Sequence, residues 1–108
     1  DVVALKGPNL LVAQRIEVKG ASHDYNNLYS FTCSKGKPKR PYTKADCDII
    51  ALVGLLDDAI SFRAVEQLHQ ITKKIHRRDF ESHDLTERTW NKALTLSLQS
   101  TKELLKGI

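Results

Sequence analysis

The sequence predicts one α+β domain, in which a mixed β-sheet is followed by a helix at the C-terminal end. Short β-branched and alternating runs fill the first two thirds of the chain, and alternation with a period of two is typical of strands. Clear helical spacing begins only after residue 83. The length of 108 residues, with 41% hydrophobic and 28% charged residues, fits a single globular domain. We therefore treat residues 1–108 as one domain.

The first strands are predicted to form a β-hairpin from residues 1–5 and 10–19, joined by the turn sequence Lys-Gly-Pro-Asn. Strict alternation at the end of the second segment places Arg15, Glu17 and Lys19 on one face. With the turn centred near Asn9, opposed residues have numbers that add up to 18. This register places Asp1 opposite Glu17.

The middle of the chain predicts the rest of a sheet of four to five strands. Residues 28–33 alternate, with Tyr29, Phe31 and Cys33 on one face. Residues 48–53 are almost continuously apolar, which favours a central strand that is covered on both sides. Residues 60–65 alternate and form the next strand. Residues 66–76 fit either a helix or an extended edge.

The C-terminal segment predicts a helix that packs on the sheet. Asp84 is placed to act as the N-cap, and Glu87 occupies the capping-box position three residues later. Trp90 and Leu94 follow with helical spacing, so we expect them to lie against the strands. Gly107 is placed to end the helix.

Several classes of protein are disfavoured by composition. The apolar stretches are too short for a transmembrane helix, and no segment resembles a signal peptide. The two cysteines, Cys33 and Cys47, lack metal-ligand spacing and are too few for a disulfide scaffold. We therefore expect an intracellular, cytoplasmic protein without a membrane partner. The chain contains no Met, so we expect that it is cropped at its N-terminus.

Positive charge is concentrated in two segments. Residues 35–44 contain no acid, two prolines and one glycine, which predicts an exposed, extended basic loop. A second basic cluster follows at residues 73–78. Such segments are either solvated surface or contacts to the phosphates of nucleic acid. The basic residues of the loop are Lys35, Lys37, Lys39, Arg40 and Lys44.

The predicted hairpin brings together a set of groups suited to metal chemistry. Two carboxylates as close as opposed Asp1 and Glu17 repel unless a cation lies between them. Carboxylates suit Mg²⁺, with Mn²⁺ as a substitute, and this ion keeps several of its waters. Lys19 on the same face can orient or help deprotonate such a water while the ion neutralises charge on a phosphate. These properties describe hydrolysis of a phosphodiester.

The motif resembles the PD-(D/E)xK nuclease superfamily, which has the restriction-endonuclease-like fold. The resemblance is carried by Asp1, the hairpin, and the apolar-Glu-apolar-Lys sequence that ends at Lys19. It extends through the Tyr-x-x-x-Asp-x-Asp-apolar run of residues 42–53 and the Thr-Trp pair at residues 89–90. These later features are similar to the small intron-encoded, phage or Holliday-junction-type members. In all, the likeness covers residues 1–94.

The resemblance implies a Mg²⁺-dependent DNA endonuclease. Asp1, Glu17 and the backbone carbonyl of Val18 would bind the metal ion, and Asp1, Glu17 and Lys19 would be the catalytic residues. The basic loop would grip DNA phosphates, with Tyr42 packing on a sugar or base. It also implies that the first helix of the family precedes Asp1. Because so small a nuclease offers little surface for sequence recognition, we expect a homodimer or a fused recognition domain.

Two other functions compete with the nuclease hypothesis. A non-catalytic module could bind nucleic acid through the basic loop alone, and its binding would be sensitive to salt and independent of Mg²⁺. A structural or protein-interaction domain would carry the loop incidentally and would not be retained on heparin or DNA columns.

Overall fold

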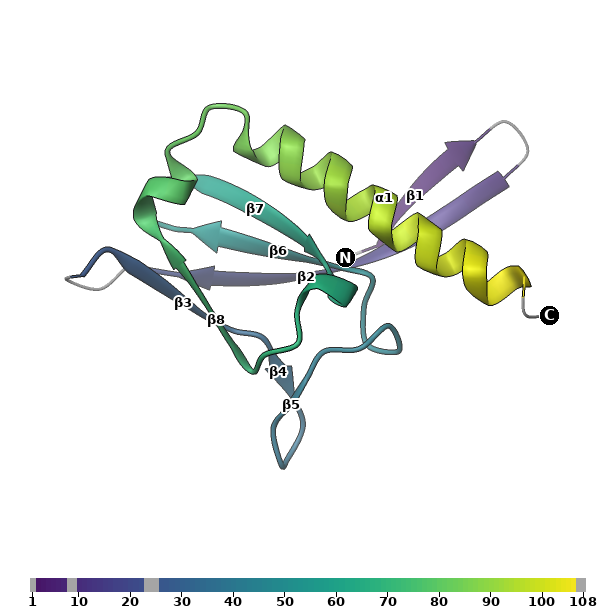
Figure 1. The fold of residues 1–108 in the computed structure, drawn as a ribbon, viewed down its shortest axis with the longest axis horizontal. Coiled ribbons are helices and arrows are strands. Elements are labelled where there is room, and N and C mark those ends of the chain that lie inside the picture. The colour runs from purple at the N-terminus through teal and green to yellow at the C-terminus, as the bar shows by residue number, and fades with distance from the viewer. Residues whose placement is uncertain (1, 8–9, 23–25, 107–108) are drawn as a thin grey trace.

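A mixed sheet forms the middle of the molecule in this computed structural model, which describes residues 2–7, 10–22 and 26–106. Side chains are described for residues 14–22 and 26–100. Within these ranges the sheet has four strands in the order β1-β2-β6-β7 (Figure 1). The strands are β1 (Val2–Gly7), β2 (Leu10–Ala21), β6 (Ile49–Gly54) and β7 (Ala59–Ala64).

The long strand β2 changes its partner halfway along. Residues 10–15 pair antiparallel with β1, and residues 16–21 pair parallel with β6. Val2 lies opposite Arg15, so opposed residues have numbers that add up to 17. The predicted hairpin is confirmed, but the predicted register is wrong by one residue, because the pairing is centred between positions 8 and 9 rather than on position 9. Asp1 lies outside the described residues.

Strand β6 is central, as its apolar run predicts. Ile49 faces one core cluster with Ala64 of β7 and Ala93 of the C-terminal helix. Ile50 and Leu52 face the other way, into a larger cluster that is described next. All three side chains are fully buried. Because both faces of β6 are covered, its sequence is apolar rather than alternating.

A second layer covers the sheet on the side of Ile50 and Leu52. It is a two-stranded sheet of β3 (Leu28–Thr32) and β8 (Thr72–His76). Tyr29 and Phe31 are buried on its inner face, as predicted, and both contact Phe80 of the short 3₁₀ helix η2 (Arg77–Phe80). The ambiguous residues 66–76 divide between β8 and another 3₁₀ helix, η1 (Val65–Gln67).

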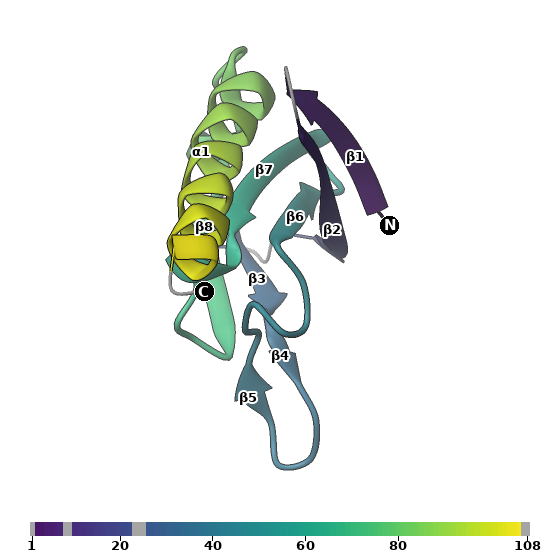
Figure 2. The same cartoon turned by 90° about the vertical axis from the view of Figure 1, so that its right-hand side faces the viewer.

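Helix α1 (Leu85–Lys106) covers the opposite face, as the sequence predicts (Figure 2). Trp90 meets Phe62 of β7 edge to face, with ring centroids 5.0 Å apart. Leu94 packs against the same cluster. The carbonyl of Asp84 accepts the first helical hydrogen bond, from the amide of Arg88 at 2.9 Å. The predicted end at Gly107 lies outside the described residues.

The basic segment is more regular than predicted. It forms a small hairpin of β4 (Ser34–Lys35) and β5 (Arg40–Pro41), which projects from the body of the molecule in both views (Figures 1 and 2). Each strand of this hairpin has only two residues. Pro38 and Pro41 limit the ladder because proline has no backbone N–H to donate. The molecule is thus a mixed α+β fold with a multi-stranded sheet and a C-terminal helix, which agrees with the predicted fold class at that level.

Candidate functional site

Glu17 and Lys19 lie together on β2, just beyond the point where the ladder with β1 ends. Glu17 pairs with Ile50 and Lys19 with Leu52, so both side chains leave β2 on the face of the larger core cluster. The Lys19 ammonium is 3.7 Å from Glu17 Oε1. The Glu17 side chain is 44% exposed and that of Lys19 is 29% exposed. Alternation along β2 thus forms a solvent-accessible pair of opposite charges at the rim of the core.

Tyr42 lies beside this pair and restrains Lys19. Its ring is 8% exposed, and Lys19 Nζ lies 5.5 Å from the ring centroid. The side-chain interaction with Tyr42 raises the pKa of Lys19, while burial opposes the rise and Glu17 adds to it. Lys19 is therefore an ammonium group near neutral pH. It can donate hydrogen bonds or attract an anion, but it is not a free base.

The base of the basic hairpin adjoins the same place. Cys33 comes directly before β4 and Tyr42 directly after β5, and both interact electrostatically with Lys19. The two strands of the hairpin therefore begin and end next to the Glu17–Lys19 pair. This is the physical link between the motif on β2 and the basic segment, which the sequence could only place near each other by analogy.

Asp46 holds the base of the hairpin. Its carboxylate accepts hydrogen bonds from both terminal nitrogens of Arg40, at 2.7 and 3.0 Å, and lies 3.8 Å from Lys35 Nζ. The backbone and hydroxyl of Thr43 donate to the same carboxylate. Arg40 first, and then Thr43, lower the pKa of Asp46. Two of the predicted phosphate-gripping residues, Lys35 and Arg40, are thus paired with an acid.

Lys37 and Lys39 are placed differently. They occupy the turn between β4 and β5, where every residue from Gly36 to Arg40 is exposed. Among the described side chains, neither lysine lies within ion-pair distance of an acid. In the basic segment, these two ammonium groups are therefore the ones most accessible to a phosphate.

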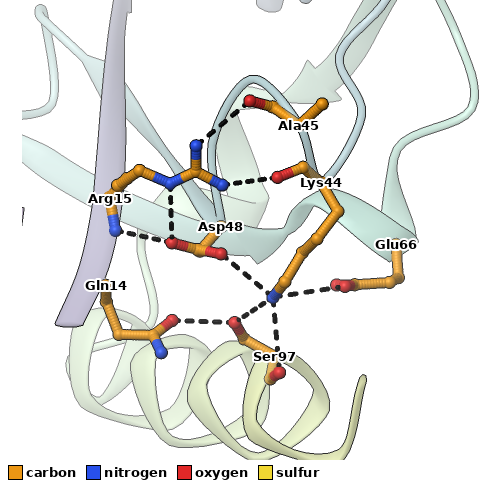
Figure 3. Close-up of polar contacts among 7 residues, drawn as sticks. All are labelled: Gln14, Arg15, Lys44, Ala45, Asp48, Glu66 and Ser97. Carbon is orange, nitrogen blue, oxygen red and sulfur yellow. Dashed lines mark hydrogen bonds and ion pairs between the residues drawn. The ribbon is translucent and has the colours of Figure 1, made fainter. Parts of the chain in front are cut away.

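Lys44 points inward rather than to solvent (Figure 3). Its ammonium donates to Ser97 Oγ at 2.7 Å and lies 3.2 Å from Asp48 Oδ1 and 3.5 Å from Glu66 Oε1. The Ser97 hydroxyl in turn donates to the buried Gln14 amide oxygen at 2.7 Å. Lys44 thus joins β2, η1 and α1 through one charge. A contact between Lys44 and DNA, as predicted, would have to replace these internal contacts.

Asp48, the residue directly before β6, completes this network. It is 7% exposed and accepts hydrogen bonds from the Arg15 amide at 2.8 Å and the Arg15 guanidinium at 3.2 Å (Figure 3). Burial alone would raise the pKa of Asp48, but the Arg15 and Lys44 hydrogen bonds outweigh it and lower the pKa. Asp48 is therefore a charged carboxylate that bonds the chain directly before β6 to Arg15 of β2. The sequence drew attention to it through the Asp-x-Asp pattern but did not reveal its partners.

The metal ligands implied by the motif are only partly visible. Within the described part of the chain, no three His, Cys, Asp or Glu side chains converge as a metal site. Glu17 supplies one accessible carboxylate, and Val18 lies between it and Lys19 with its side chain 53% exposed on the other face. One or two carboxylates with several waters are enough for Mg²⁺. The described residues therefore supply one carboxylate of the implied set, Glu17, while Asp1 lies outside the described residues.

Neither thiol is a candidate nucleophile. Cys33 and Cys47 are free and buried. Burial raises the pKa of Cys33, and burial followed by Glu17 raises that of Cys47 to about 11. Both are therefore protonated near neutral pH, and a thiol reacts poorly in that state.

Comparisons with protein-family models, with curated proteins and with solved structures found no match for this chain. In the described residues, no helix is both long enough and apolar enough to cross a membrane.

Proposed function

We propose that this protein is a Mg²⁺-dependent endonuclease that hydrolyses DNA phosphodiester bonds. The observation that carries the proposal is the Glu17–Lys19 pair, in which an accessible carboxylate and an ammonium lie 3.7 Å apart on one face of β2. The adjoining hairpin, with Lys37 and Lys39 exposed at its turn, supports nucleic acid as the substrate because such cations bind phosphates.

The resemblance gives each of these residues a role, and the role of Asp1, which lies outside the described residues, rests on the resemblance alone. Glu17, the Val18 carbonyl and Asp1 would hold the ion, which when bound supplies Lewis-acid stabilisation of the phosphate and a more acidic water. Lys19 is an ammonium near neutral pH, and its contact with Tyr42 raises its pKa further, so it orients the attacking water or a phosphate oxygen by donating a hydrogen bond. Of the two roles that the sequence left open for Lys19, the raised pKa favours orientation over deprotonation.

The test is nicking of supercoiled plasmid DNA in the presence of Mg²⁺ or Mn²⁺. Glu17→Gln and Lys19→Met keep the size of each side chain and remove its charge, and each should reduce the rate by about 100-fold or more, as removal of a transition-state contact does. The matched control is Glu81→Gln, which alters an exposed carboxylate elsewhere and should retain activity. Nicking that survives both site substitutions would reject the proposal.

A non-catalytic nucleic-acid-binding module is the second candidate, favoured by the exposed lysines of the hairpin turn. It differs from the nuclease in its response to metal. If calorimetry finds saturable Mg²⁺ binding that disappears in Glu17→Gln, the binding module is rejected. If Mg²⁺ does not bind, and DNA binding is sensitive to salt but indifferent to Glu17, the binding module replaces the nuclease.

A further inference from the structure

A positively charged hollow lies between the edge strand β7 and helix α1, and the predicted nuclease motif does not include it. Its volume is about 260 Å³. A second hollow of about 300 Å³ adjoins it and shares Arg63, Arg88 and Thr89. The first is lined by Phe62, Arg63, Gln67, Arg88, Thr89 and Lys92.

Arg63 is the central residue of this hollow. It is half-buried on β7, and its NH1 group donates to Ser61 Oγ at 2.7 Å and to the Phe62 carbonyl at 3.2 Å. Among the described side chains, no acid lies within 4 Å of the guanidinium, and its Nε and NH2 groups have no hydrogen-bond acceptor. Burial first, and then the neighbouring Arg88, lower the pKa of Arg63, while Asp79 opposes this shift. A half-buried cation in this state carries a desolvation cost, which the two hydrogen bonds of NH1 and the charge of Asp79 offset only in part.

The neighbouring charges add to the positive potential. Arg88 and Lys92 are four residues apart on α1 and therefore lie on the same helical face. Arg78 lines the adjoining hollow, together with one acid, Asp79. The ion pair of Arg88 with Asp84, at 3.7 Å, involves two side chains that are each more than half exposed, so solvent weakens it. The positive charges of Arg63, Arg78, Arg88 and Lys92 outnumber the negative charges of Asp79 and Asp84.

Like charges gathered around a hollow do not stabilise the fold. Cations four residues apart on a helix repel each other, and Arg63 adds a third charge to the same place. An anion in the hollow would remove both costs. The planar guanidinium fork suits an oxyanion that accepts two parallel hydrogen bonds.

We infer that the hollow between β7 and α1 is a phosphate-binding site, in which the free Nε and NH2 edge of Arg63 holds the oxyanion while Arg88 and Lys92 close over it. The site is separate from the Glu17–Lys19 pair and does not depend on hydrolysis. The same chemistry serves two sources: free inorganic phosphate, or a backbone phosphate of a nucleic acid strand that passes this edge.

The experiment measures binding of each source to the whole protein by calorimetry, with inorganic phosphate in one arm and a short DNA duplex without Mg²⁺ in the other. Arg63→Gln and Arg63→Lys should each weaken binding about tenfold or more, because the lysine keeps the charge but loses the fork. Lys92→Gln, which changes an exposed residue with no effect expected on folding, should weaken it in the same arm. Lys39→Gln removes an equal charge from the hairpin and is the matched control for inorganic phosphate.

The result assigns the source or rejects the site. Saturable binding of inorganic phosphate that falls in Arg63→Gln and Lys92→Gln but not in Lys39→Gln identifies a site for free phosphate. Binding of the duplex alone, weakened by the same two substitutions, identifies a backbone phosphate. The inference is overturned if neither arm shows saturable binding. It is also overturned if Arg63→Lys and Lys92→Gln weaken binding no more than Lys74→Gln, which changes an exposed lysine outside the hollow. Because plasmid nicking tests Glu17 and Lys19 separately, either proposal can fail without the other.

Discussion

At the residue scale, Tyr42 restrains the Lys19 ammonium, which is protonated near neutral pH with or without this contact. The side chain lies 8% exposed beneath the ammonium and raises the pKa of Lys19. The sequence predicted a different role for Tyr42, stacking on a sugar or base. Its burial leaves little ring surface for such a contact, so we expect the aromatic ring to act through Lys19. In the proposed nuclease, Tyr42 is therefore a positioning residue.

Removing the Tyr42 hydroxyl should lower the pKa of Lys19 toward its ordinary value of 10.5. Tyr42→Phe keeps the ring face, and Tyr42→Leu removes both the hydroxyl and the ring, so the second change should lower the pKa further. The measurement is an NMR titration of the Lys19 side chain from pH 8 to pH 12, with Lys74 as the exposed reference. An unchanged Lys19 titration in both variants would show that Tyr42 does not control this charge.

Candidate site residues were predicted unevenly, for a physical reason. Strand alternation is a local property, so Glu17 and Lys19 could be placed on one face from sequence alone. Whether a basic side chain points to solvent or inward depends on residues far away. Lys44 was predicted to contact phosphate, yet its ammonium bonds Ser97, 53 positions later. Arg63 drew no attention because it stands in an ordinary alternating strand, and its hollow exists only after α1 packs.

At the element scale, helix α1 both covers the sheet and protects its edge. β7 is an edge strand, and two threonines of α1 bond its outer backbone. The Thr89 hydroxyl accepts from the amide of Phe62 at 3.0 Å, and the Thr86 hydroxyl donates to the carbonyl of Ile60 at 3.0 Å. These bonds occupy backbone groups that would otherwise be open to another strand.

The Thr89 hydroxyl should be worth more to stability than its size suggests. Thr89→Val keeps the shape of this buried side chain but leaves the Phe62 amide without a partner, which should cost about 1–3 kcal/mol of unfolding free energy. Thr95→Val is the matched control, since that hydroxyl bonds only the Asn91 carbonyl within the same helix. Urea denaturation followed by circular dichroism measures both. Equal losses in the two variants would contradict the role of α1 at the strand edge.

Elements were predicted best where the hydrophobic pattern was strong. The apolar run before Gly54 and the alternation in β2, β3 and β7 all gave strands in the expected places. Residues 66–76 could not be resolved because their spacing fits both periods, and β3, the partner of β8 within this segment, lies 40 to 48 positions earlier. Pairing of that kind depends on the whole fold, and so does the one-residue register of the first hairpin, which its turn geometry sets.

At the scale of the whole molecule, one partly buried charge network joins the sheet, the 3₁₀ helix η1 and α1. Asp48 accepts hydrogen bonds from Arg15 and pairs with Lys44, which also contacts Ser97. The same Asp48 carboxylate has a lowered pKa. Since proton uptake by that carboxylate would break several contacts at once, the network links global stability to pH.

Stability should therefore decline in acid. A carboxyl whose pKa is lowered by folding stabilises the protein fully above its ordinary value of 3.8, and this contribution is lost as the pH falls through the lower folded-state value. Asp46 and Asp84 shift in the same direction. Urea denaturation at a series of pH values from 7 to 2 should show the decline. Asp48→Asn should be less stable at pH 7 and should lose less on acidification; an equally steep decline would exclude Asp48 as a contributor.

The parallel pairing of β2 with β6 has a consequence for how the chain folds. It joins residues 33 positions apart, such as Ile16 and Ile49, and the Gln14–Ser97 contact spans 83 positions. Loop closure of this kind must occur before the ladder can form. The chain therefore loses conformational entropy before the hydrogen bonds and apolar contacts of the ladder can stabilise it. Refolding of so non-local an arrangement should take milliseconds to seconds rather than microseconds, and an unpaired β6, apolar on both faces, would be the segment most prone to self-association during that interval.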